Sequence, residues 1–202
     1  MPPATLRAPS SLSTTTTASP PHLTPPLLSW LSGPWHVTHS TLPMWKSARN
    51  VLITYTPLPS SATSPAHIDD LVTYQSLSSS KLKTVRGVDK PFSVVAPGAT
   101  PEAEGAEERA SLGYNWRGKG LLMIATSKWE ILGYGEEEEG GNSWVVTYFA
   151  KTLFTPAGVD FYSRKGRLSE RTVGEIKAGL EGLGGEVAKL AEGLFEVKMD
   201  DA

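Results

Sequence analysis

Between residue 33 and residue 164 the chain alternates apolar and polar side chains in one short run after another, and no helical pattern interrupts these runs. Trp35, Val37 and His39 have the two-residue spacing of one strand face, and Val51 and Ile53 repeat it in the next run. Pro and Gly separate the runs, as they do between strands that turn back on themselves. Many short strands without intervening helices predict an antiparallel all-β sandwich or barrel and argue against a parallel α/β sheet.

The pattern changes after the last of these runs. Ser169 can cap a helix, and Glu170 lies in its first turn, where the helix dipole favours negative charge. An apolar stripe at helical spacing follows, formed by Val173, Ile176, Leu180 and Leu183. Glycines at positions 182, 184 and 185 end this helix. We therefore predict eight to ten antiparallel strands followed by a C-terminal α-helix.

Three regions follow from the composition along the chain. Residues 1–26 are rich in Pro, Ser and Thr and hold too little apolar area to offset the entropy of ordering, so we expect a disordered tail. Residues 27–185 form the β-domain with its helix, in which an apolar cluster at residues 27–31 could plug one end. Residues 186–202 are expected to form a second short helix and a tail.

Bulk properties exclude several classes of protein. The net charge of −2 gives no indication of a nucleic-acid partner or of a membrane surface. The longest apolar run, residues 121–125, is read as a strand and is far shorter than the ~20 residues of a membrane span. The chain has no cysteine, which favours a cytoplasmic location. The Ser/Thr-rich first 45 residues, which lack acidic side chains, leave an organellar transit segment as the alternative.

Two motifs at the ends of the β-region resemble those of one family. Residues 161–170 (FYSRKGRLSE) combine a final aromatic strand, Ser-Arg, a short turn and an acidic helix start, and Gly33-Pro34-Trp35 opens the first strand. Together they resemble the two outer motifs of the lipocalins, within the broader calycin group. The resemblance implies an up-and-down β-barrel with the helix packed outside. It also implies that Arg164 packs across the indole of Trp35 and closes the base of the barrel beside Gly33.

The same resemblance implies a cavity for a small hydrophobic molecule. In a small barrel the interior side chains are both core and pocket wall, so strand aromatics are the candidate ligand contacts. The first-to-second-strand loop, with Met44 and Trp45, is expected to act as a lid over the open end. The other candidates for ligand binding are Tyr55, Tyr74, Trp116, Trp144, Tyr148 and Tyr162.

Catalysis and metal binding have weaker support in the sequence. His36 and His39 point to opposite faces if they share a regular strand, and no other histidine has metal-ligand spacing, so no metal and no cofactor are predicted. No serine elbow and no cysteine nucleophile is present. The sequence therefore predicts a binding protein, and the alternative is a cofactor-free cyclase or isomerase of secondary metabolism. That enzyme would act on a hydrophobic polyketide or terpenoid intermediate with His39 or Tyr148 as proton donor. A protein partner is not indicated.

Overall fold

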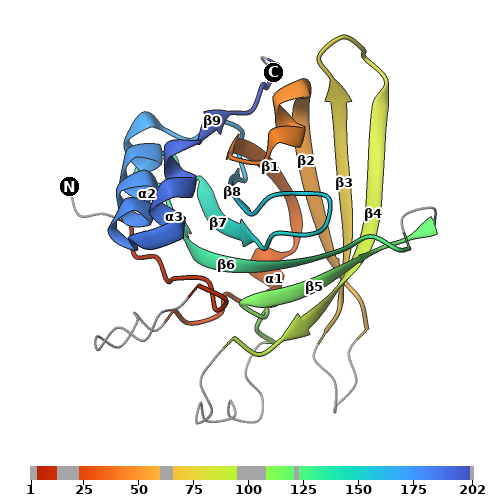
Figure 1. The fold of residues 1–202 in the computed structure, drawn as a ribbon, viewed down its shortest axis with the longest axis horizontal. Helices are drawn as coiled ribbons and strands as arrows, with labels where there is room; N and C mark the ends of the chain where they lie inside the picture. Colours follow the sequence, from red (N-terminus) through yellow and green to blue (C-terminus); the bar gives the residue numbers. More distant parts are fainter. Residues whose placement is uncertain (1–3, 13–22, 60–65, 95–107, 121–122, 201–202) are drawn as a thin grey trace.

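A computed structural model describes residues 4–12, 23–59, 66–94, 108–120 and 123–200. Eight antiparallel strands close into a barrel (Figure 1). The strands are β1 (Gly33–Ser40), β2 (Ala48–Pro57), β3 (Ile68–Ser76), β4 (Leu82–Phe92), β5 (Gly113–Gly118), β6 (Thr126–Glu136), β7 (Ser143–Phe149) and β8 (Gly158–Ser163). Each strand pairs with the next, and β1 pairs with both β2 and β8, so no barrel edge remains open. The predicted antiparallel barrel is confirmed.

The two ends of the barrel differ. Helix α1 (Leu28–Leu31) precedes β1 at one end, the base, where Leu28 and Leu31 are buried. The connections β1–β2, β3–β4, β5–β6 and β7–β8 lie at the opposite end, the mouth. The β1–β2 connection contains a short 3₁₀ helix, η1 (Pro43–Ser47). The apolar run expected as a strand at 121–125 is instead part of a mouth connection, because residues 123–125 lie between β5 and β6; residues 121–122 lie outside the described residues.

The C-terminal region packs outside the barrel, as predicted. Helix α2 (Glu170–Gly182) begins after Ser169, whose hydroxyl accepts a hydrogen bond from the Thr172 N–H, and it buries Ile176 and Leu180. Helix α3 (Gly185–Glu192) follows after Gly184, which has φ +69°. Both helices cover the outer face of β6–β8 in a second apolar cluster, separate from the barrel interior.

The last described residues are not a simple tail. Strand β9 (Phe195–Glu196) pairs with the mouth half of β1, and Lys198 bridges to Arg49 on β2. Strands β1 and β2 pair only from Gly33 to His36 on the β1 side, so this segment fills the space between them nearer the mouth. Val197 is buried there and donates its N–H to Thr38. The C-terminal segment therefore contributes to barrel closure.

Part of the N-terminal region also differs from the expected disordered tail. In residues 4–12, Leu6 and Arg7 are buried against the outer face of the barrel. Arg7 forms an ion pair with Glu130 of β6 at 2.7 Å and donates to the carbonyl of Ile131 at 2.8 Å. Residues 1–26 contain few apolar side chains, but residues 4–12 are held in place by a buried ion pair and by backbone hydrogen bonds instead. Residues 13–22 lie outside the described residues.

Candidate functional site

Three carboxyl groups lie inside the barrel. Asp70 on β3, Asp89 on β4 and Asp160 on β8 are all buried, and Asp89 is completely inaccessible to solvent. Asp70 lies opposite Tyr55, and Asp160 shares a strand face with Tyr162, so carboxyl and phenol groups occupy the same interior. Carboxylates are almost never fully buried without a partner, so this cluster is the most unusual feature of the molecule.

Three polar atoms of this interior have no hydrogen-bond partner among the described residues. They are Asp70 Oδ1, Asp89 Oδ2 and the Tyr162 hydroxyl oxygen, which interacts with the side chains of Tyr55 and Thr147 without reaching hydrogen-bond geometry with either. The other oxygen of Asp89 accepts a hydrogen bond of 2.8 Å from the Trp129 indole. An unpaired buried polar atom costs ~1–3 kcal/mol, so atoms of this kind mark a place where a further polar group fits.

Burial shifts the titration of every one of these carboxyl groups. Desolvation raises the pKa of Asp70 to about 7, helped by the charge of Asp69 and opposed by a hydrogen bond from Trp116. Desolvation also raises the pKa of Asp160 to about 7 against hydrogen bonds from Ser40 and Trp45. For Asp89, desolvation and the neighbouring Asp70 hold the pKa well above its usual range. This shift favours the protonated carboxyl group of Asp89, which can both donate and accept a hydrogen bond.

The phenols beside these acids are held in their neutral form. Desolvation and the charges of neighbouring groups raise the pKa of Tyr55, and desolvation does the same for Tyr162. Tyr55 stacks on Trp129 with 5.6 Å between ring centroids, and Tyr114 stacks on the same indole at 4.8 Å. The site is thus a set of carboxyl and phenol groups in an aromatic wall, an environment in which a hydrogen bond is stronger than in water.

A glycine positions one of these aromatic rings. Gly87 lies opposite Asp70 on β3 and opposite Gly118 on β5. A Cβ atom at Gly87 would lie 2.2 Å from Nε1 of Trp116, so only glycine lets this indole lie flat against β4. The indole N–H is thereby brought to Asp70. The glycine is part of the site even though it has no side chain.

The base of the barrel carries the contact that the lipocalin resemblance implies. The Arg164 guanidinium lies 3.6 Å from the centroid of the Trp35 ring. It donates to the carbonyls of Pro34 at 2.7 Å and Ser32 at 2.6 Å, and also to that of Trp30. Gly33, with φ +93°, sits against the same guanidinium. Arg164 is thus occupied by contacts at the base of the barrel.

The structure brings several of the predicted ligand residues into the barrel. Tyr55 and Tyr162 belong to the interior cluster, and Trp116 packs against it while remaining half-buried. Tyr74 is half-buried nearer the mouth, with its ring 5.7 Å from that of Trp45. Trp45 is not an exposed lid residue: it is buried, and its indole donates to Asp160 at 3.2 Å. Its neighbour Met44 is the exposed residue of the β1–β2 connection.

Other candidates lie outside the barrel. Trp144 and Tyr148 belong to the cluster under α2 and α3 and not to the interior. His39 also faces outward, with its ring 5.7 Å from Phe161 in the same outer cluster, because an irregularity between Val37 and His39 reverses the alternation of β1. The two weak catalytic candidates, His39 and Tyr148, therefore do not reach the interior acids.

Grooves at the surface of the described residues lie in three regions among others. One of about 550 Å³ lies at the base beside Trp30 and Tyr134, and one of about 400 Å³ lies between His39 and α2. The third, of about 610 Å³, runs along β4–β6 to the β7–β8 connection. In the part of the chain that the structure describes, no group of His, Cys, Asp or Glu has metal-binding geometry, and no helix is long and apolar enough to cross a membrane.

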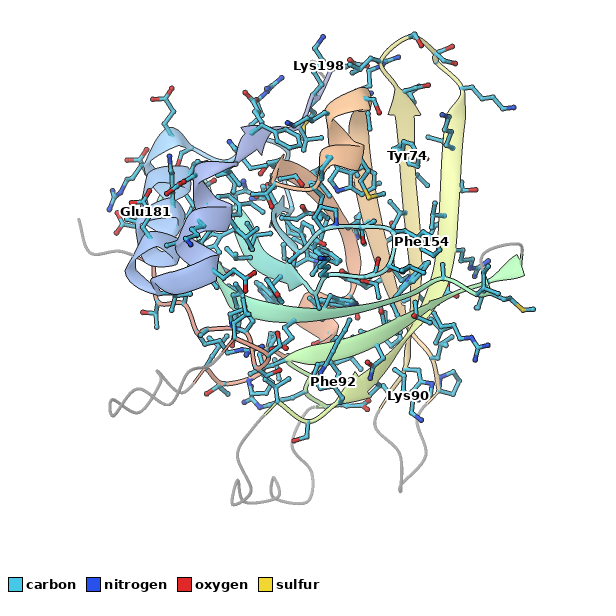
Figure 2. The ribbon with its side chains drawn as sticks, in the orientation of Figure 1. Tyr74, Lys90, Phe92, Phe154, Glu181 and Lys198 are labelled. Atoms are coloured by element: carbon cyan, nitrogen blue, oxygen red, sulfur yellow. The ribbon has the colours of Figure 1, made fainter. Side chains whose placement is uncertain are left out.

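The interior acids could have been found in the sequence. Asp70 shares strand parity with Val72 and Tyr74, so a carboxyl group stands on a face that is otherwise apolar and aromatic. Asp160 shares parity with Tyr162 in the same way. A charged residue in phase with the apolar face of a strand was the available signal. Figure 2 shows how densely side chains from all strands fill this region.

Comparison with known proteins gives a likeness of fold. No family model matches the chain, and no curated protein matches it. Among solved structures, lobster apocrustacyanin A1 superposes with a TM-score of 0.52 at 12% identity, over 86% of this chain and 80% of that one. The siderocalin Ex-FABP, which functions through dual ligand specificities, gives 0.48 at 11% identity over 85% and 91%. The closed eight-stranded barrel, its outer helix and the likeness to the lobster protein show that this chain has a lipocalin-like fold.

Proposed function

We propose that the barrel binds a small, largely apolar molecule that carries a hydrogen-bond donor such as an amine or a hydroxyl. A lipocalin-like barrel is typical of proteins that bind small hydrophobic ligands. The observation that supports the donor group is the trio of unpartnered atoms, Asp70 Oδ1, Asp89 Oδ2 and the Tyr162 hydroxyl, which come from β3, β4 and β8. One ligand group that satisfies them would gain affinity by relieving their desolvation cost.

The charge of the interior selects among ligands. Asp70, Asp89 and Asp160 lie in it, whereas Arg164 is held at the base by three carbonyl groups. A ligand carboxylate would meet acids and no basic partner, so we expect fatty acids to bind poorly. A protonated alkyl amine would instead form an ion pair with Asp70 and would favour the ionised form of that carboxyl group. The proposed site of action is the cytoplasm, which the cysteine-free sequence favours.

A displacement experiment tests this proposal. Nile red, an uncharged dye that fluoresces when desolvated, is bound first and then displaced by dodecylamine, dodecanol or dodecanoate. We expect Nile red to bind with a Kd near 1 μM, about −8 kcal/mol. Dodecylamine and dodecanol should displace it at concentrations at least ~10-fold lower than dodecanoate, about 1.4 kcal/mol of discrimination.

A pair of matched variants locates the binding site. Tyr162→Phe removes the interior hydroxyl without changing the shape of the ring and should weaken dodecanol by about 1 kcal/mol. Tyr148→Phe makes the same change on the outer face and should leave displacement unchanged. Absence of Nile red binding by the folded protein would refute the proposal, and so would equal effects of the two variants.

One observation supports an enzyme as the second candidate. Asp89 is buried, its pKa is raised by desolvation, and its free oxygen has no partner among the described residues. A neutral carboxylic acid inside an aromatic cage can protonate a bound polyene or carbonyl group and hold it folded for ring closure. In this form of the cyclase alternative the proton donor is Asp89, because His39 and Tyr148 face outward.

Turnover separates the enzyme from the carrier. Ligand that copurifies from the natural source can be identified by native mass spectrometry, and its precursor then incubated with the protein. An enzyme should convert the precursor, and Asp89→Asn should slow conversion at least ~100-fold while retaining binding, the usual contribution of a general acid. Binding without conversion by the unmodified protein would leave the carrier as the function.

A further inference from the structure

The four connections at the mouth and the strand ends beside them are strongly basic although the whole chain has a net charge of −2. We define the mouth loops as the four connections together with the strand residues that adjoin them, residues 41–50, 76–86, 116–120, 123–129 and 149–158. They contain nine of the 19 basic residues and none of the 21 acidic ones. The nine are Lys46, Arg49, Lys81, Lys83, Arg86, Arg117, Lys119, Lys128 and Lys151. Asp200 pairs with Arg49, and Asp69 pairs with Arg86 and Lys119, so these two acids from elsewhere offset only part of the charge.

The same loops carry exposed apolar side chains. Within the described residues, every large apolar side chain that is exposed lies in a mouth loop, and the set consists of Met44, Leu77, Leu82, Met123, Ile124, Leu153 and Phe154. Ile124 is 91% exposed, Leu153 89% and Phe154 81%, so these three protrude from the surface and support nothing beneath them. Apolar side chains gathered at one end of a molecule mark an interaction surface.

The arrangement of the elements separates this end from the acidic part of the molecule. In Figure 1 the β3–β4 and β5–β6 hairpins lie on the side of the barrel away from α2 and α3. Figure 2 shows Phe154 and Glu181 far apart, with Glu181 on the helical side. The helices and the β6–β7 connection hold many of the acids, so the molecule has a basic apolar end and an acidic end. A charged surface would orient such a molecule with its mouth toward negative charge.

A groove that runs along β4–β6 and reaches the β7–β8 connection adds a place for an anionic group. It has a volume of about 610 Å³ and extends from Thr126 and Ser127 to Ala150 and Leu153. Its basic lining residues are Lys90, Arg117, Lys128 and Lys151, with His67 at one side, and its described lining includes no acidic residue. Ile124 lies two residues before the lining residue Thr126, and Phe154 directly follows the lining residue Leu153. Basic and exposed apolar side chains are therefore adjacent at this groove.

We propose that the mouth loops dock the protein on an anionic lipid bilayer. Protruding apolar side chains can enter the headgroup region singly, without the complementary pocket that each would need on a protein partner. The surrounding Lys and Arg side chains attract anionic lipid, and the groove accommodates a phosphate or carboxylate headgroup. Docking would turn the mouth of the barrel toward the membrane, and it does not depend on which ligand the interior takes.

Site-specific labelling tests the orientation, because the chain has no cysteine. A single Leu153→Cys variant is labelled with a polarity-sensitive fluorophore, and Glu181→Cys on α2 serves as the control at the opposite side. The full chain is mixed with vesicles of phosphatidylcholine alone or with vesicles that also contain about 30% phosphatidylserine, which give the membrane a negative surface potential. The label at position 153 should shift to shorter wavelength on the anionic vesicles only, and the label at 181 should not shift.

Charge and apolar variants test the two components separately by vesicle sedimentation. Lys81→Glu with Lys151→Glu should reduce partitioning at least ~10-fold, whereas Lys177→Glu with Lys189→Glu, on α2 and α3, should change it by less than ~2-fold. Ile124→Ser with Phe154→Ser should also reduce it, and thermal melting checks that these exposed changes leave the fold intact. Four results would overturn the proposal: no binding to anionic vesicles, equal binding to neutral ones, equal shifts at both labels, or equal loss in both charge variants. Self-association abolished by Phe154→Ser without vesicle binding would assign the surface to a protein contact instead.

Discussion

Each interior carboxyl group belongs to an aspartate, a residue that is normally ionised and exposed to water. Asp70, Asp89 and Asp160 are buried among aromatic rings, and desolvation is the first cause of the raised pKa of each. A carboxyl group whose pKa is higher in the folded than in the unfolded chain binds a proton that the unfolded chain releases. Its contribution to stability is full below the unfolded pKa and is lost as the pH rises through the folded pKa.

A pH titration of Asp70→Asn tests this directly. For Asp70 the window runs from ~4, its unfolded pKa, to about 7 in the folded state. The free energy of unfolding of the unmodified protein should fall across this window, by up to ~1.4 kcal/mol per pH unit for each titrating group. Asp70→Asn should flatten the fall and be the more stable protein at pH 8. Urea denaturation between pH 4 and pH 8 measures it, and an unchanged slope in the variant would contradict the burial of an ionisable Asp70.

At the scale of elements, the N-terminal segment acts as an outer strap on β6. Its Arg7 side chain contacts Glu130, the carbonyl of Ile131 and the carbonyl of Leu112, and Ala4 bonds to Glu175 of α2. Leu6 packs beside Gly133 and Gly179, where a Cβ atom would meet Leu6 or the adjoining backbone closer than 3.0 Å. Residues 4–12 thus join the barrel wall to the helix that covers it.

Arg7 should therefore be costly to remove. Arg7→Met leaves Glu130 buried without its partner, and we expect a loss of ~3–5 kcal/mol, as for other broken buried ion pairs. Adding Glu130→Leu should recover most of that loss, because apolar side chains can replace a buried pair at little cost. Deleting residues 1–12 should lower the Tm by about 10 °C or more. Thermal melts of all three variants measure this, and a deletion that melts like the full chain would show that the segment is not part of the folded core.

For the whole molecule, closure of the barrel depends on a contact between its two ends in sequence. Trp35 opens β1 and Arg164 follows β8, and the guanidinium also binds the carbonyls of the segment between α1 and β1. Trp35 in turn contacts Trp30 in a tilted arrangement, with 5.3 Å between ring centroids. One arginine therefore joins the first strand, the last strand and the base helix.

A double-mutant cycle measures this closure. Trp35→Ala should cost ~3–5 kcal/mol and Arg164→Ala about 1–2 kcal/mol from the cation–π contact, with more from the lost hydrogen bonds. The combined variant should lose at least ~0.5 kcal/mol less than the sum, because the two side chains touch. Urea denaturation of the four proteins gives the coupling energy. Strict additivity would show that the contact contributes nothing to closure.

The sequence by itself determined those features that local pattern or local chemistry specify. Strand alternation predicted an antiparallel sandwich or barrel, and the resemblance to lipocalins selected the barrel. The helix start at Ser169 and its glycine-rich end appear where predicted. The order of Gly33, Trp35 and Arg164 anticipated the base. These succeed because a strand face, a helix cap and a positive φ each depend on a few neighbouring residues.

Only the tertiary structure decided which face of each strand is the interior. A single irregularity in β1 turns His39 outward although it stands two residues from the inward Val37, and the barrel wall places Trp144 and Tyr148 under the helices. The contact of Arg7 with Glu130 spans 123 residues, so no local pattern announces it. The basic end of the molecule likewise exists only because the up-and-down topology places four connections distant in sequence at the same end of the barrel. The two-residue alternation of a strand defines its two faces, but the pairing register, the bulges and the closure of the barrel decide which of the two faces the interior.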